Sequence, residues 1–409
     1  MKETKFKNTE IGEIPEDWEV RTINSFCSVK TGPFGSMLHA EDYVAKGTPI
    51  VTTEHFKNGI LPLVGKDIPQ VGIEDLKRMS SYTLTKDDIV FSRVGSVDIN
   101  ALVTVRQKGW LFSGRVLRVR PFKQTDSLYL HYGLLKHSVR SDIVSRAVGL
   151  TMASINTKIL GETELSLPPL NEQHRIASAL TSIDNLISSL GKLIEKKKNI
   201  KQGTMQQLLT GKTRLKGFTE PWVEKKLGDI GSLAMCKRIF QEETSEKGDV
   251  PFYKIGTFGQ QADAYITKGK YEQFKQMYRF PQKGDVLISA AGTIGRTVIY
   301  NGEPAYFQDS NIVWLAHNGK YITNNFLFYI YQRTDWNTED TTIARLYNNN
   351  FNNTCIHFPS SITEQQAIAA ILTKMDDEIT ALEATKTKYE AIKQGMMQQL
   401  LTGKIRLIS

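Results

Sequence analysis

The sequence contains a segment that looks like part of a phosphate-binding loop, Gly211-Lys212-Thr213. In a P-loop, GxxxxGK[ST], backbone amides hold the phosphates while the lysine and the hydroxyl serve the terminal phosphate and Mg²⁺. The pattern requires glycine at position 206, which is Gln206, and no strand-like run precedes it. The related segment Gly403-Lys404-Ile405 also lacks the hydroxyl. Both segments therefore predict the end of a helix rather than an ATP site.

The other patterns for catalysis are also incomplete. Glu224-Lys225-Lys226 has the letters of a nuclease E-x-K pair, but such a triplet in a charged stretch arises readily by chance. Pro168-Pro169-Leu170 lacks the acid or amide and the aromatic residue of a base methylase site. The seven histidines show no ligand spacing such as HExxH, and no GxSxG occurs. We therefore expect no catalytic centre and no metal site, which leaves binding as the function.

Length, charge and cysteine usage narrow the class of protein. A chain of 409 residues predicts two or three domains, and its net charge of +9 suits a polyanionic partner. Cys27, Cys236 and Cys355 are far apart, which argues against a disulfide framework or a zinc knuckle and favours a reducing compartment. No apolar run approaches the roughly 18 residues of a membrane span. We expect a cytoplasmic protein.

Two stretches of the chain repeat each other. Residues 201–215, KQGTMQQLLTGKTRL, recur at 393–407 as KQGMMQQLLTGKIRL, with 13 identities in 15 positions at an offset of 192. At the same offset, nine residues between Glu172 and Leu190 match residues between Glu364 and Leu382. A repeat of about 45 residues that follows each of two divergent regions predicts a duplicated architecture.

Each repeated segment predicts a long helix with a heptad seam. Pro168 and Pro169 end the preceding segment, Asn171 is a suitable N-cap, and Gly211 and Gly403 are suitable C-terminal stops. Apolar residues follow at alternating spacings of four and three, as in a coiled coil. The expected seam comprises Ile176, Leu180, Ile183, Ile187 and Leu190 in the first helix, and Ile368, Leu372, Met375, Ile379 and Leu382 in the second.

A long helix with a narrow apolar stripe needs a partner, and the only matching stripe in the chain is its own repeat. We therefore expect the two helices to pair, and to pair antiparallel because a region of about 150 residues separates them. The alternative is that each helix packs on its own domain.

The regions between the helices contain short β-branched runs bounded by Gly, Pro, Asn and Asp, interspersed with aromatic helical stretches. The predicted fold is therefore α+β, with two mixed α/β domains, two long helices forming an antiparallel coiled coil, and a pseudo-two-fold repeat. The expected boundaries are 1–168 and 213–359 for the domains, and 169–212 and 360–409 for the helices.

Several motifs in a duplicated order point to a known family. The first half contains Ile14-Pro-Glu-Asp-Trp18, Gly32-Pro-Phe-Gly-Ser36, Leu167-Pro-Pro-Leu-Asn-Glu-Gln173 and Gln207-Leu-Leu-Thr-Gly-Lys212. The second contains Phe218-Thr-Glu-Pro-Trp222, Phe358-Pro-Ser-Ser-Ile-Thr-Glu-Gln365 and Gln399-Leu-Leu-Thr-Gly-Lys404. This arrangement resembles the specificity (S) subunit of type I restriction-modification systems. The chain departs from the family at Phe358-Pro359-Ser360, where the usual Pro-Pro-Leu is lost.

The resemblance implies a function and a set of partners. In that family each variable region is a target recognition domain that reads one half of a split, asymmetric site in double-stranded DNA. The helices dock two modification (methyltransferase) subunits, which use S-adenosylmethionine, and restriction subunits, which use ATP with Mg. This chain is then expected to be the non-catalytic specificity subunit, without a cofactor of its own. A helix from Asn171 to Leu209 would extend about 58 Å, between one and two DNA turns of roughly 34–36 Å.

Because phosphates and base edges are contacted mainly by basic and amide side chains, the candidates for DNA contact are such residues in the lobes. Gly292-Thr-Ile-Gly295-Arg296 also matches a GxxG loop that clamps nucleic acid, although a tight turn between strands is the alternative. The candidates are Lys30, Ser36, Lys57, Arg78, Arg93, Arg115 and Lys158 in the first lobe, and Lys237, Arg238, Arg279, Arg296, Asn311 and Arg345 in the second.

Three other functions remain open on the sequence alone. The chain could be the recognition subunit of a fused methylase-nuclease or of another methylation-based phage-defence system. It could be a coiled-coil scaffold whose lobes bind protein. It could also conceal a nuclease or a methylase, which turnover by the purified chain would reveal.

Overall fold

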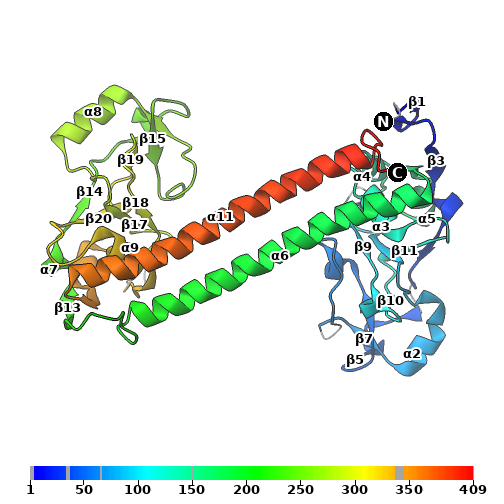
Figure 1. Cartoon of the computed structure of the whole chain (residues 1–409), viewed down its shortest axis with the longest axis horizontal. Coiled ribbons are helices and arrows are strands. Elements are labelled where there is room, and N and C mark those ends of the chain that lie inside the picture. The colour runs from blue at the N-terminus through cyan, green and yellow to red at the C-terminus, as the bar shows by residue number, and fades with distance from the viewer. Residues whose placement is uncertain (1–3, 34–36, 65–66, 150, 337–344, 409) are drawn as a thin grey trace. The chain divides into compact units, whose positions relative to one another are not determined.

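The computed structural model describes residues 4–33, 37–64, 67–149, 151–336 and 345–408. The chain forms two compact units, Met1–Gly191 with Ala384–Ser409, and Lys192–Glu383. Each unit contains one α/β lobe and parts of two long helices, α6 (Leu170–Leu208) and α11 (Ile362–Leu400) (Figure 1). We call residues 4–169 the first lobe and residues 209–361 the second lobe.

The first lobe is built on the antiparallel sheet β4-β11-β8-β9 and the smaller sheet β10-β6-β7-β5, with β1-β2 and β12-β3 as two-stranded ribbons. Its helix α3 lies against β9 of the larger sheet, and α4 packs on α3 (Figure 1). The strands are β1 (Phe6–Thr9), β2 (Gly12–Pro15), β3 (Glu19–Thr22), β4 (Cys27–Thr31), β5 (Tyr43–Val44), β6 (Thr48–Val51), β7 (Gln70–Val71), β8 (Ile89–Ser92), β9 (Asn100–Leu102), β10 (Leu111–Phe112), β11 (Val116–Pro121) and β12 (Glu164–Leu167). The helices are α1 (Ile23–Phe26), α2 (Ile73–Arg78), α3 (Ser127–Leu134), α4 (His137–Ser145) and α5 (Thr157–Gly161).

The second lobe repeats this plan with the sheet β14-β20-β17-β18, the sheet β16-β15-β19 and the ribbon β13-β21. Its strands are β13 (Trp222–Lys226), β14 (Ser232–Met235), β15 (Val250–Tyr253), β16 (Tyr265–Ile266), β17 (Val286–Ser289), β18 (Thr297–Ile299), β19 (Tyr306–Phe307), β20 (Ile312–Ala316) and β21 (Cys355–Pro359). Its helices are α7 (Leu227–Ile230), α8 (Lys268–Met277), α9 (Asn324–Arg333) and α10 (Asn348–Asn353). The strand orders β4-β11-β8-β9 and β14-β20-β17-β18 of the two main sheets correspond one to one, so the duplication extends beyond the helices into the lobes.

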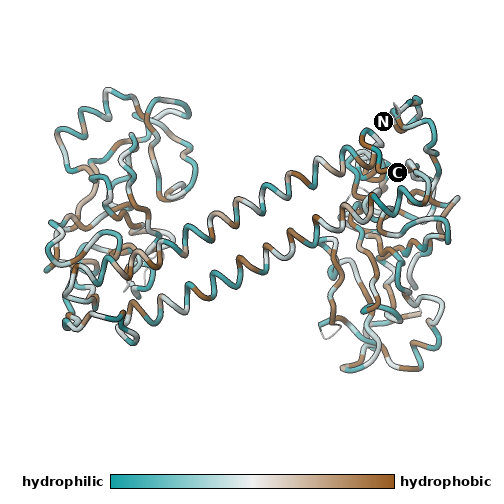
Figure 2. The backbone as a smooth tube through the Cα atoms, in the orientation of Figure 1, coloured by the Kyte–Doolittle hydropathy of each residue, from teal (hydrophilic) through white to brown (hydrophobic). Residues whose placement is uncertain are grey.

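The prediction of two long helices packed antiparallel is confirmed. In the first unit the start of α6 lies beside the end of α11, where Lys393 Nζ is 2.6 Å from Asp184 Oδ1. In the second unit the end of α6 lies beside the start of α11, where Lys201 Nζ is 2.5 Å from Asp376 Oδ1. Figure 2 shows hydrophobic turns recurring along both helices, as a paired seam requires.

Both predicted arrangements, the helices paired with each other and each helix packed on its own domain, describe part of the seam. Ile176 and Leu180 are buried in the core of the first lobe together with Met397 and Leu400 of α11. Ile368 and Leu372 are buried in the second-lobe core together with Leu208 at the end of α6. The first turns of each helix therefore bury apolar surface against their own lobe and against the end of the other helix at once. Ile183 and Ile379 are also buried, whereas Ile187, Leu190, Met375 and Leu382 are half-buried.

The helix ends differ slightly from expectation. The first long helix begins at Leu170, so Asn171 lies inside the first turn and is not the N-cap. The second begins at Ile362, where Ser361 Oγ accepts from the Glu364 amide at 3.4 Å. Beyond each C-terminus the predicted glycine does end the helix: Gly211 has φ +69 and Gly403 has φ +70, in the left-handed region. A Cβ at Gly403 would lie 2.4 Å from the Pro15 ring, so a side chain is excluded there.

Candidate nucleic-acid interface

The residues shared by the two repeats join each helix to its lobe and to the other helix. Asp184 of α6 accepts from the Tyr132 hydroxyl at 2.7 Å while it pairs with Lys393. The second unit has the same triad, since Asp376 accepts from the Tyr329 hydroxyl at 2.8 Å while it pairs with Lys201. Burial, more than any other factor, raises the pKa of both tyrosines, so their hydroxyls remain donors.

A second repeated contact, an ion pair between an arginine and a buried glutamate, lies at the start of a long helix in each unit. In the first unit Glu172 lies at the start of α6 and is buried, and its carboxylate accepts from the Arg406 guanidinium at 2.8 Å and from Trp18 Nε1 at 3.1 Å. In the second unit Glu364 lies at the start of α11 and accepts from Arg214 at 2.9 and 2.6 Å. Each arginine follows the repeated Leu-Thr-Gly-Lys segment, which explains why the repeat is most regular there.

The first-lobe candidates with acidic neighbours are surface ion pairs. Lys57 pairs with Glu54, Arg78 lies 2.5 Å from Asp75, and Lys158 lies 3.9 Å from Glu162. Such exposed pairs contribute little to stability, and their cations can exchange a carboxylate for a phosphate at small cost. Ser36 lies outside the described residues.

Lys30 belongs to a cluster of cations that sequence analysis only partly found. Its ammonium group donates to the Ser81 carbonyl at 3.0 Å and lies 4.2 Å from the centre of the Tyr82 ring. Arg118 is directly opposite Lys30 in the β4–β11 pairing, and Arg120 follows it on the same face. Burial, together with Arg118 and Arg120, lowers the pKa of Lys30. The signal for the two arginines was their period of two in the strand Val116-Leu-Arg-Val-Arg.

Arg120 and Arg118 have different surroundings. Arg120 makes a two-pronged ion pair with the buried Asp88, at 2.6 and 2.7 Å, and chiefly this hydrogen bonding raises the arginine's pKa. Arg118 is only 6% exposed, and its Nε has no hydrogen-bond partner within the described part of the chain. Its guanidinium carbon lies 5.9 Å from the Phe112 ring centre. The cluster therefore carries more positive than negative charge.

Two arginine candidates, one in each lobe, bind backbone oxygens. Arg93 donates from Nε to the Ile155 carbonyl at 3.2 Å and from Nη1 to the Gly114 carbonyl at 2.9 Å. Arg296 donates from Nη1 to the Phe258 carbonyl at 2.9 Å. Both side chains are half-buried and hold loops in place, a role that sequence analysis did not distinguish from DNA contact. Gly292 and Gly295 of the GxxG segment have positive φ and form a turn between β17 and β18.

The remaining second-lobe candidates divide into two groups. Lys237 lies 5.3 Å from the Tyr278 ring centre, and Arg279 donates to Ser232 Oγ at 3.3 Å, and both are exposed. The other group converges on the turn Asp309-Ser310-Asn311. There Arg238 pairs with Asp309 at 2.8 Å, and Arg345 donates to Ser310 Oγ at 3.0 Å.

In the first lobe Arg115 stands before β11, as Asn311 stands before β20 in the second. Arg115 is exposed, and across the described ranges no hydrogen bond or ion pair engages its guanidinium. The structure thus brings Arg238, Asn311 and Arg345 together, and leaves Arg115 open to a ligand.

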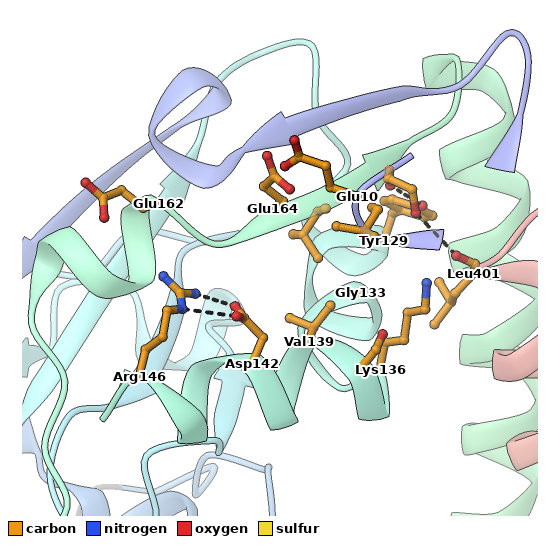
Figure 3. Close-up of a pocket in the computed structure, with 14 residues that line it drawn as sticks. Glu10, Tyr129, Gly133, Lys136, Val139, Asp142, Arg146, Glu162, Glu164 and Leu401 are labelled. Carbon is orange, nitrogen blue, oxygen red and sulfur yellow. Dashed lines mark hydrogen bonds and ion pairs between the residues drawn. The ribbon is translucent and has the colours of Figure 1, made fainter. Parts of the chain in front are cut away.

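A cavity of about 600 Å³ lies in the first unit, between β12, α4 and residues near Glu10 (Figure 3). Glu10, Glu162 and Glu164 line it, and its Arg146 is already paired with Asp142. Burial lowers the pKa of Lys136, which also lines it. The excess of carboxylates over free cations makes this cavity a poor site for a phosphate, so it is not part of the basic surface.

Within the described ranges, no helix is long and apolar enough to cross a membrane. Among the same residues, no group of three or more His, Cys, Asp or Glu side chains could hold a metal ion.

Comparison with known proteins gives a consistent result. The chain is 32% identical over 347 residues to a putative type I restriction enzyme specificity subunit of Haemophilus influenzae, covering 82% of this chain and 89% of that protein. It is 29% identical to a putative type I specificity subunit of Methanocaldococcus jannaschii, over 99% of this chain and 98% of the relative. The crystal structure of the S subunit of a type I restriction-modification system from M. genitalium has the same fold, with a TM-score of 0.60 at 18% identity over 94% of this chain and 96% of that one.

Residues 15–202 and 219–394 each match the type I restriction modification DNA specificity domain, so both lobes with their helices are accounted for. This match agrees with the non-catalytic, DNA-directed role that the motifs predicted. The chain belongs to the family of type I restriction-modification specificity (S) subunits, which confer DNA sequence specificity.

Proposed function

We propose that this chain recognises a split, asymmetric site in double-stranded DNA, with each lobe reading one half. The observation that carries the proposal is that the main sheets of the two lobes share one strand order, whereas the sequences of the lobes differ. Two copies of one scaffold with different surface residues suit two different half-sites. Each long helix has 39 residues and is about 58 Å long, between one and two DNA turns of roughly 34–36 Å, which suits a site with two separated halves.

The repeated helices would dock two modification subunits. The repeated triads and ion pairs described above place like residues at like positions in both units, which suits two copies of one partner. Leu193 and Ile200 of α6 are exposed and seven residues apart, as a helix-binding stripe would be. A similar solved structure, with a TM-score of 0.57 at 16% identity, was described for the complex assembly and conformational transition of a type I system.

Restriction subunits would join the same assembly. The modification subunits would use S-adenosylmethionine, and the restriction subunits would use ATP with Mg, whereas this chain would supply neither cofactor site. The DNA-directed surface would include the Lys30 cluster and the residues around Arg115 and Asn311, and the complex would work in the cytoplasm.

The test is sequencing of host DNA for modified bases, with and without this gene. Loss of methylation at a split motif in the deletion strain, restored by the gene on a plasmid, is the expected result. Unchanged methylation, in a strain whose modification subunit is expressed, would contradict the proposal. Co-purification of the tagged chain with the modification subunit provides the control for assembly.

A further inference from the structure

The two lobes share one arrangement of backbone hydrogen bonds, which we call the backbone frame, at one end of their main sheets. Strand pairing fixes the correspondence: Val116 is opposite Ser92 in the first lobe, and Ile312 is opposite Ser289 in the second. The preceding residues, Arg115 and Asn311, therefore occupy the same position. This equivalence is given by the strand register.

The main-chain hydrogen bonds around these positions are also duplicated. The Arg93 amide donates to the Arg115 carbonyl at 3.0 Å, as the Ala290 amide donates to the Asn311 carbonyl at 2.7 Å. A third segment then closes the frame, since the Ile155 amide donates to Arg93 and the Leu346 amide donates to Ala290, at 2.9 and 2.8 Å.

The neighbouring bridges extend the match, with Val94 opposite Ser154 and Ala291 opposite Arg345. One backbone frame thus carries three pairs of unlike side chains: Arg115 and Asn311, Arg93 and Ala290, and Ser154 and Arg345.

An arginine braces the turn in each lobe, but from a different segment. Arg93 holds the Gly114 carbonyl in the first lobe, and Arg345 holds Ser310 Oγ in the second. Ser310 has φ +54, an unusual conformation for a residue with a side chain, and this brace acts directly on it. The turn is therefore fixed in both lobes, although the residues that fix it are different. Rigid support of this kind is what a side chain needs to read a base edge.

The side chains at the shared position are available for a ligand. Arg115 is exposed and Asn311 is half-buried, and neither side chain makes a hydrogen bond to any described residue. Arg238 and Arg345 lie at the turn that carries Asn311, and because Asp309 offsets the charge of Arg238, the turn keeps one excess positive charge. Arginine binds the O6 and N7 acceptors of guanine with two hydrogen bonds, and asparagine binds the N7 and N6 groups of adenine in the same way.

We propose that Arg115 and Asn311 are equivalent specificity-determining residues, that Arg115 reads a guanine in one half-site, and that Asn311 reads an adenine in the other. This inference rests on the proposed function. It adds the position in each lobe at which sequence is read, and the base that each side chain selects.

The test uses the assembled methyltransferase, made of this chain and its modification subunits. The wild-type complex first modifies DNA from a modification-free host, and base-modification sequencing gives its motif. The variants Arg115→Ala and Asn311→Ala are then treated alike, followed by the exchanges Arg115→Asn and Asn311→Arg. Lys123→Ala and Lys320→Ala are matched controls, because they remove exposed lysines beyond the opposite ends of β11 and β20.

In each alanine variant one position of the modified motif should become degenerate, while the other half-site stays unchanged. The position that loses its specificity should be a guanine for Arg115→Ala and an adenine for Asn311→Ala. Duplexes with and without that base pair should bind the wild-type complex with a ratio on the order of 10- to 100-fold, and the variant with a ratio near one. Arg115→Asn should favour adenine at the same position, and Asn311→Arg should favour guanine.

Motifs that stay unchanged in both alanine variants would overturn the inference and leave the proposed function standing. So would degeneracy in both halves at once. If a variant complex is inactive, Arg115→Gln decides, because glutamine keeps a long polar side chain but pairs with adenine and not with guanine. Unaltered guanine preference in that variant would refute the role of Arg115. The absence of any split motif with the wild-type complex would instead refute the proposed function.

Discussion

Replacing Arg406 by alanine should destabilise the first unit severely. The Arg406 side chain is 8% exposed and the Glu172 side chain 2%, and the guanidinium contacts both carboxylate oxygens of Glu172 at 2.8 Å. Without Arg406 the Glu172 carboxylate stays buried at the start of α6 and keeps the N–H donors of Trp18 and Leu407. Breaking a buried ion pair by removal of one partner costs about 3–5 kcal/mol. Because these two donors remain, we expect the lower part of that range.

The Arg406 contact to Asp17 provides the matched control. Asp17 pairs with the same guanidinium at 2.7 Å, but its side chain is 53% exposed. Asp17→Asn should therefore cost under about 1 kcal/mol, as exposed pairs usually do. The hydrogen bond from Arg406 is the main cause that lowers the pKa of Asp17. The stability that Asp17 contributes is thus present above its unfolded pKa of about 3.9 and is lost as the pH falls below it. Arg406→Ala should remove this part of the acid dependence.

Hydrogen exchange at increasing urea, followed by mass spectrometry, measures these costs locally. Peptides from the first turns of α6 should open about 3 kcal/mol more easily in Arg406→Ala, while peptides of the second lobe act as an internal reference. Arg406→Lys should be intermediate, because one ammonium cannot satisfy both carboxylate oxygens. If Arg406→Ala lowers the free energy of opening no more than Asp17→Asn does, that result would refute the claim that the repeated arginines stabilise the helix ends through buried ion pairs.

Three further predictions follow from the seam, the cysteines and the basic surface. Leu180→Asp or Leu372→Asp should abolish co-purification with the modification subunit, since each buries a charge where a helix joins its lobe, and intact co-purification would argue against the paired helices. In the native chain the exposed Cys355 should react with a maleimide at least tenfold faster than the buried Cys27 and Cys236. Burial raises the pKa of both buried thiols, that of Cys236 to about 12. Equal reaction rates, measured by peptide mapping, would contradict this prediction. The DNA affinity of the assembled complex should fall steeply as the salt concentration rises, with a linear plot of log affinity against log salt concentration. A salt titration in which the affinity stays constant would show that phosphate contacts do not contribute to binding.

The duplicated plan and the family could both be predicted from the amino-acid sequence. The repeat at an offset of 192 gave both long helices and their stops, because contacts made twice leave the same residues in two places. The β-branched runs bounded by Gly, Pro, Asn and Asp predicted strands, which the structure has as β8, β11, β17 and β20, since period and turn residues are local signals. The sequence also marked basic side chains, but charge alone does not say which cations face a ligand.

Tertiary structure alone decided what those side chains do. Glu172 and Arg406 meet across 234 residues, and Arg93 and Arg296 turn inward to backbone carbonyls. The equivalence of Arg115 and Asn311 depends on strand register, which is set by pairing between distant segments and flips a side chain to the other face with a slip of one residue. Such contacts are long-range, and no local pattern encodes them.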